Sequence, residues 1–236
     1  MSNIFSTVAR LLRFRLTREE FAQFDYRHLL LGLLSTWVVG MGRWWDDPGA
    51  HMLQHLGVGS LIYIFILSLM LWLVVLPLKP KAWSYVHVLT FVALTSPPAI
   101  LYAIPVEKFM SLDAARILNV LFLCVVATWR VALLIFYLIR HAELRAAAPV
   151  AAFLPITAIV VSLTVMNLER AAYVSMSGMR GEPTAHDSSY SILTLLTMLA
   201  VLLIIPLLIL YVVLIVKAQL ASDVAELNLE ERQIKS

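Results

Sequence analysis

The sequence predicts an all-α fold of the polytopic membrane class, in which several helices cross a lipid bilayer. Hydrophobic residues make up 61% of the chain and charged residues only 14%, a balance that favours lipid over water as the surrounding solvent. The apolar residues are gathered into long stretches, and the lysines and arginines are gathered into alternate connections between them. These observations indicate a membrane-embedded bundle rather than a water-soluble domain.

Six stretches are candidates for transmembrane helices. A helix that rises about 1.5 Å per residue needs about 20 apolar residues to cross a hydrocarbon core of about 30 Å. The first stretch is the shortest, because its uninterrupted apolar run extends only from Leu29 to Gly42, with Trp44 and Trp45 placed to reach the headgroup layer. If this stretch is re-entrant, the number of spans falls from six to five. The expected spans are residues 28–45, 56–78, 83–104, 113–139, 147–168 and 191–216.

Two amphipathic segments flank the predicted bundle of residues 28–216. The leader, residues 1–27, begins with a stretch in which apolar residues recur at helical spacing among Arg10, Arg13 and Arg15, a pattern typical of a basic helix lying on anionic lipid. Thr17 and Glu20 then form a capping-box pattern that starts a second helix. The tail, residues 217–236, mixes acidic and apolar residues and is expected to continue the last span as an amphipathic helix.

The distribution of basic residues predicts the orientation. With six spans, the connections on one side of the membrane hold only 4 basic residues. The positive-inside rule therefore assigns the opposite side, which holds more of them, to the cytoplasm. Both termini are therefore expected in the cytoplasm, and we expect the chain to lie in a bacterial inner membrane. The cytoplasmic side would hold 12 basic residues: Arg10, Arg13, Arg15, Arg18, Arg27, Lys79, Lys81, Arg140, Arg145, Lys217, Arg232 and Lys235.

The fourth predicted span carries two arginines on one helical face. At 100° per residue, Arg116, Asn119 and Arg130 lie within about 60° of one another. Arg130 is close to the middle of the span, where a basic residue costs about 2.5 to 3.5 kcal/mol. It could bind an anionic ligand, a lipid headgroup or a carboxylate of another subunit. Alternatively, it packs against carbonyls, hydroxyls and water inside the bundle.

Pro97 and Pro98 predict a broken helix in the third span, because two consecutive prolines remove two helical donors. Such a break can expose backbone polar groups to a transported substrate. The alternative is a structural kink whose free backbone groups are satisfied by Thr95, Ser96 and neighbouring helices.

The outer connections contain the residues best suited to a metal ion. His51 and His55 are spaced i and i+4, and Asp46 or Asp47 could supply a further ligand for a divalent metal. The structural alternative is that an aspartate caps the next helix and the histidines cover polar neighbours. Two further residues, Asn167 and Glu169, are expected to clamp the fifth span to Arg116 and Asn119 of the fourth.

Three functions remain open on these residues. The first, which the short connections and the two amphipathic ends favour, is a noncatalytic integral membrane component of a homo- or hetero-oligomeric assembly. The second is a channel or transporter for an anion or anionic lipid, and the third is an outer-leaflet, metal-dependent membrane enzyme. The expected partners are the bilayer, anionic lipids and either a second copy or another membrane protein, and no pattern indicates nucleic acid.

Overall fold

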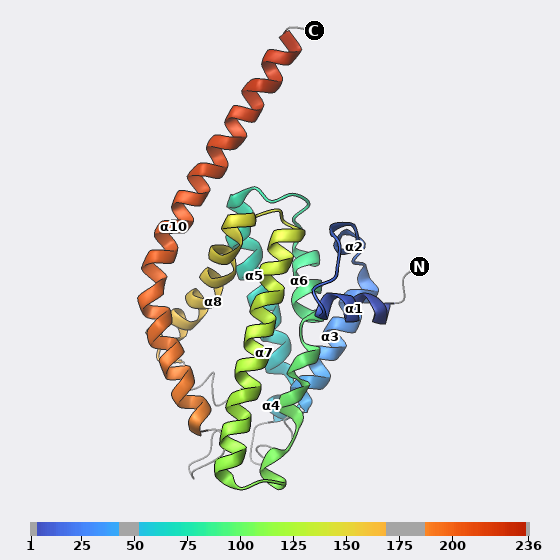
Figure 1. Cartoon of the computed structure of the whole chain (residues 1–236), viewed down its shortest axis with the longest axis vertical. Helices are drawn as coiled ribbons and strands as arrows, with labels where there is room; N and C mark the ends of the chain where they lie inside the picture. The colour runs from blue at the N-terminus through green and yellow to red at the C-terminus, as the bar shows by residue number, and fades with distance from the viewer. Residues whose placement is uncertain (1–3, 43–51, 169–186, 235–236) are drawn as a thin grey trace.

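The computed structural model of the chain describes residues 4–42, 52–168 and 187–234, and all regular secondary structure within them is helical. The helices run alongside one another, with α10 along one side of the body and α1 and α2 on the opposite side (Figure 1). One end of the body carries α2 and the α5–α6 and α7–α8 connections, and we call it the α2 end (Figure 1). It corresponds to the predicted cytoplasmic side.

Four helical segments are long and apolar enough to cross a membrane, which indicates an integral membrane protein. The first joins α5 (Val58–Val75) to the 3₁₀ turn η1 (Leu76–Leu78), and the second is α7 (Leu112–Arg140). The third joins η4 (Arg145–Ala147) to α8 (Ala148–Val165). The fourth is the segment Thr194–Val224 of α10 (Asp187–Ile234). These segments correspond to the predicted spans 56–78, 113–139, 147–168 and 191–216.

The remaining two predicted spans form shorter helices. Residues 28–45 contribute to α3 (Tyr26–Met41), and residues 83–104 contribute to α6 (Tyr85–Leu94) and the 3₁₀ helix η2 (Pro97–Ala103). The α-helix ends at Leu94, three residues before Pro97, where the two prolines predict a break. Ser96 is buried at this break, and its hydroxyl lies 2.7 Å from that of Thr36 on α3.

The N-terminal segment folds onto the body as two short helices. In α1 (Ile4–Leu12), Leu11 is fully buried, and the Leu12 carbonyl accepts a hydrogen bond of 3.1 Å from Trp129 Nε1 of α7. The second helix, α2 (Arg18–Ala22), begins with the predicted capping box, in which the Thr17 and Glu20 side chains each accept a hydrogen bond from the other's backbone amide. These contacts attach the leader to α7.

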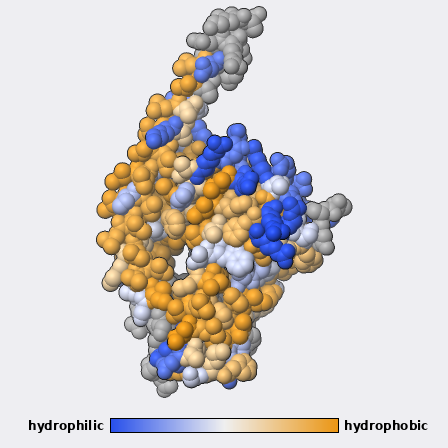
Figure 2. Space-filling model, viewed as in Figure 1, coloured by the Kyte–Doolittle hydropathy of each residue, from blue (hydrophilic) through white to orange (hydrophobic). Residues whose placement is uncertain are grey.

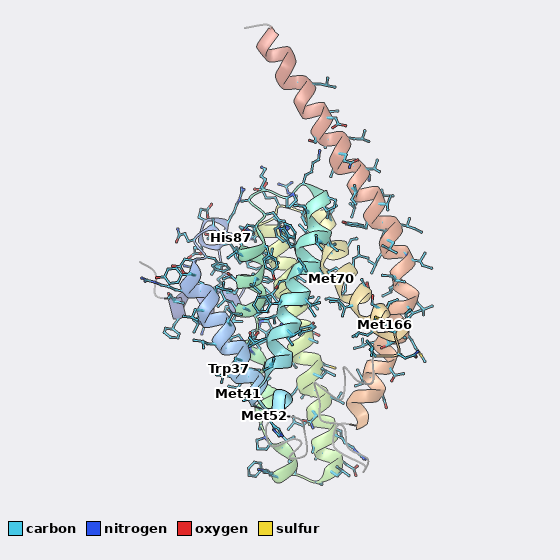
Figure 3. The ribbon with its side chains drawn as sticks, turned by 180° about the vertical axis from the view of Figure 1, so that it is seen from behind. Trp37, Met41, Met52, Met70, His87 and Met166 are labelled. Carbon is cyan, nitrogen blue, oxygen red and sulfur yellow. The ribbon has the colours of Figure 1, made fainter. Side chains whose placement is uncertain are left out.

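Glycines let α3 approach its neighbours closely. A Cβ on Gly32 would lie 2.7 Å from Ala93 Cβ and 3.0 Å from the backbone of α6. Beyond the end of α3, the short helix α4 (Met52–His55) leads to Gly57, which has a φ of 66° and packs against the Gly40 backbone. Trp37 Nε1 donates a 2.8 Å hydrogen bond to the Leu56 carbonyl and so joins α3 to the start of α5. Trp37 and Met52 lie at the same end of the body in Figure 3.

The last helix packs mainly on α8, and most of its apolar surface is not buried by the other helices. Only 6% of its most apolar window is buried within the chain. It lies beside α8, and Tyr211 donates a hydrogen bond of 2.7 Å to the Val74 carbonyl of α5. Beyond this contact, α10 extends past the α2 end of the body (Figure 1).

We predict that Gly32→Ala destabilises the protein by about 1 to 3 kcal/mol, because the added methyl group would overlap the α6 backbone. The matched control is Gly59→Ala, since a Cβ at Gly59 meets no atom within 4 Å. Thermal unfolding in detergent, followed by circular dichroism, should show a lower midpoint for the first variant only. Equal midpoints for the two variants would contradict close packing of α3 on α6.

Candidate functional site

The predicted metal ligands are only partly within the described residues. Asp46, Asp47 and His51 lie outside them, and His55 is the last residue of α4. Within residues 4–42, 52–168 and 187–234, no group of three or more His, Cys, Asp or Glu side chains could hold a metal ion. The metal site therefore remains a prediction that concerns the connection preceding α4.

The predicted clamp between the fourth and fifth spans also extends beyond the described residues, because Glu169 lies outside them. Asn167 follows the end of α8 as an exposed residue with a φ of 54°. Arg116, near the start of α7, is paired with Asp113 one helical turn away at 3.6 Å. Asn119 lies one turn further along the same helix, partly buried.

Arg130 occupies the middle of α7 and is partly buried. Within the described part of the chain, its side chain has no hydrogen bond or ion pair to another residue. Pro97 and Pro98 are likewise partly buried, at the start of η2. At the break that they cause, the Ser96 hydroxyl contacts that of Thr36 on α3.

The α2 end of the body contains a buried stack of aromatic and histidine rings. The Tyr137 ring is fully buried and lies parallel to that of Phe91, with the centroids 4.0 Å apart. His141 stacks on Tyr137 at 5.0 Å, and His87 stacks on His141 at 5.9 Å. Phe21 of α2 meets Tyr137 edge to face at 5.2 Å. The stack therefore joins α2, α6 and α7, and Figure 3 shows His87 at this end.

His141 is poorly placed to carry a charge. Its side chain is 2% exposed, and neither ring nitrogen has a hydrogen-bond partner among the described residues. Burial lowers the pKa of His141 to about 4, and the neighbouring His87 and Arg18 act in the same direction. The nearby Ala82 backbone opposes the shift in part. The imidazole is therefore neutral at pH 7.

Glu143 connects three segments at the surface of this end. Its carboxylate pairs with Arg18 of α2 and with Lys81 of the α5–α6 connection, the latter at 3.0 Å. The hydrogen bond from Lys81 is the main reason that the pKa of Glu143 is lowered, and the Arg18 charge adds to it. A second ion pair, between Arg10 and Glu20, holds α1 to α2. Hydrophilic side chains gather over this region (Figure 2).

A cavity of about 750 Å³ opens beside these ion pairs, between the leader and the ends of α7 and η4. We call it the arginine cavity. Its wall consists of residues 14–19 from the leader, Ile139 and Arg140 at the end of α7, and Glu143 and Arg145 from the α7–α8 connection. The charged side chains that line it are Arg15, Arg18, Glu19, Arg140, Glu143 and Arg145.

The four arginines of this cavity contribute to the predicted charge asymmetry, but the sequence does not predict that they share one site. The two leader arginines are separated from Arg140 and Arg145 by more than a hundred residues, and no motif connects the two pairs. The available signal was the position of Arg140 and Arg145 on either side of a short connection between two spans. The docking of the leader onto that connection could not be inferred from spacing.

No family model, curated protein or solved structure matches the chain. The geometry of its own residues therefore carries the functional argument.

We predict that the protein loses stability as the pH falls from about 6.5 to about 4, because the unfolded state binds a proton at His141 that the folded state resists. The stability contributed by the neutral imidazole is complete above about pH 6.5 and decreases as the pH falls towards the folded pKa. Between pH 7.5 and pH 5 the loss should be about 2 kcal/mol. Thermal unfolding at the two pH values should show a smaller difference for His141→Phe, which keeps a stacking ring.

His55→Phe is the control, because His55 lies in α4 at the opposite end of the body. It should keep the pH dependence of the unmodified protein. An unchanged dependence in His141→Phe would refute the assignment.

Proposed function

We propose that the protein is a noncatalytic integral membrane component that assembles into an oligomer, with α10 as the interaction element. The main observation that supports this proposal is the length of α10. Its 48 residues correspond to about 72 Å of helix, far more than the bilayer core of about 30 Å. The helix can therefore cross the membrane and still present several turns beyond it.

The part of α10 beyond the body carries an apolar stripe that its own chain leaves uncovered. Leu220, Val224 and Leu227 are 59%, 57% and 62% exposed. Their spacing of four and then three residues places them on one face, as at the seam between two paired helices. A second copy of the same segment is the simplest partner, because a symmetric pair would cover both stripes at once.

Arg130 is a second candidate contact. Since no described residue pairs with it, a carboxylate or carbonyl from a neighbouring subunit would offset the cost of placing an arginine within the membrane. In this role it would act within the bilayer, whereas the stripe on α10 would act at the end of the apolar segment Thr194–Val224 and beyond it.

The proposal includes a topology of six crossings with both termini in the cytoplasm of a bacterium, in the inner membrane. In support, the α5–α6 and α7–α8 connections lie at the same end as α2, and α10 leaves the body at that end (Figure 1). Lys81, Arg140 and Arg145 in these connections follow the positive-inside rule. In this arrangement, α3 and the α6–η2 segment are the two short crossings, and α1 packs against α7 at the level of Trp129.

We predict that replacing Leu220, Val224 and Leu227 together by serine lowers the oligomeric state of the purified full-length protein, because the apolar seam is lost. Native mass spectrometry of gently solubilised protein should show a shift towards single subunits. The control is the Ala218→Ser, Ala221→Ser double variant, which changes other faces of the same helix and should leave the subunit number unchanged. A single subunit in the unmodified protein, or an unchanged oligomer in the triple variant, would refute the proposed role of α10.

The transport alternative is supported by Arg130 and by the break at Pro97, but Thr36 and Ser96 are buried at this break with their hydroxyls in contact. We therefore expect reconstituted vesicles to show no flux of chloride or of fluorescent phosphatidylglycerol above that of empty vesicles. Flux that disappears in Arg130→Gln would instead favour a channel or transporter. The enzyme alternative remains a prediction that depends on Asp46, Asp47, His51 and His55.

A further inference from the structure

The arginine cavity lies where two membrane-spanning segments end. Arg140 is the last residue of the span Leu112–Arg140, and Arg145 is the first residue of the span Arg145–Val165. The cavity is therefore at the level where the hydrocarbon core gives way to the headgroups. The leader forms its other wall, so the cavity is bounded by protein on two sides at the depth of the lipid phosphates.

The charges in the cavity are not balanced. The Glu143 carboxylate is already occupied by Arg18 and Lys81. Arg15, Arg140 and Arg145 make no ion pair with a carboxylate within the described part of the chain, and all three are exposed. Glu19 remains as a single acidic group, and the pKa of its carboxyl is lowered by hydrogen bonds with its own backbone amide and with Thr17. The three arginines thus exceed the available acid, and the cavity favours an anion.

Apolar side chains line the same cavity beside the arginines. Phe14, Leu16 and Ile139 contribute to its wall. Phe14 also packs edge to face on Phe136, with the centroids 5.7 Å apart, so this side of the cavity continues onto the apolar surface of α7. Apolar side chains do not stabilise a free inorganic anion. A phospholipid, in contrast, carries an anionic phosphate and an apolar glycerol and acyl part on one molecule.

We propose that the arginine cavity binds the phosphate of an anionic phospholipid. Arg15, Arg140 and Arg145 donate to the phosphate oxygens, and Phe14, Leu16 and Ile139 pack against the glycerol and the upper acyl carbons. Guanidinium groups suit this role because their donors match phosphate oxygens in pairs. Basic pockets between membrane helices are known to hold anionic headgroups in this way. The lipid would lie between the leader and the α7–α8 connection and fasten one to the other.

This binding site does not depend on the proposed oligomer, because every residue in it comes from one chain and none lies on α10. A failure of the tail experiment leaves the lipid proposal standing, and the reverse also holds.

The test uses the purified full-length protein in detergent, titrated with phosphatidylglycerol or with neutral phosphatidylcholine, and counts the bound lipids by native mass spectrometry. The Arg15→Gln, Arg145→Gln double variant removes two arginines that make no ion pair among the described residues, so the fold should be kept. The matched control is Arg13→Gln, Arg27→Gln, which removes the same charge from exposed positions in the leader outside the cavity. If the first double variant does not elute as folded protein, Arg140→Gln is compared with Arg13→Gln in the same way.

The expected result is an affinity for phosphatidylglycerol about tenfold lower in the cavity variant, with the control within about twofold of the unmodified protein. Phosphatidylcholine should bind weakly to all three proteins. Equal losses in the cavity variant and in the control would show diffuse attraction to the leader and overturn the proposal, as would no loss in either. Displacement of the lipid by an equimolar amount of glycerol 3-phosphate would show that the site takes a soluble phosphate, and would overturn the assignment to lipid.

Discussion

The stacked rings of Phe91, Tyr137 and His141 hold the leader, α6 and α7 in one arrangement, and the α2 end of the molecule depends on them. Each aromatic pair of this kind contributes about 0.5 to 1.5 kcal/mol beyond the area that it buries. Because Phe21 packs edge to face against Tyr137, the same stack fixes where α2 lies. The position of α2 then decides which residues of the leader meet the α7–α8 connection. The ion pairs of Glu143 and the arginine cavity both follow from that placement.

A second constraint acts within the bundle, where lipid supplies no hydrophobic drive that brings helices together. Packing there relies on small residues that let backbones approach, and Gly32 serves this purpose between α3 and α6. The proline break follows the end of α6, one turn beyond Ala93, the residue that Gly32 meets. Since α3 is already close, Thr36 can reach Ser96 and give its hydroxyl a partner where the helix is interrupted. Close packing and the break therefore support each other.

Much of the fold was predictable because its signals are local. Four apolar stretches, the capping box at Thr17 and the interruption before Pro97 each follow from residues close together in the sequence. The arginine cavity was not predictable, because it depends on Trp129 meeting the Leu12 carbonyl and on Phe14 meeting Phe136, contacts between segments more than a hundred residues apart. Composition shows that the leader is basic and amphipathic. It does not show that the leader packs on α7.

The low burial of α10 has a consequence for the order in which the molecule is built. A helix within lipid satisfies its own backbone hydrogen bonds, so it is stable there before it meets any other helix. Because the rest of the chain buries little of α10, its insertion and its packing are nearly separate events. The core formed by α3, α5, α6 and α7 can therefore assemble before α10 packs beside α8. The last helix then joins a finished surface.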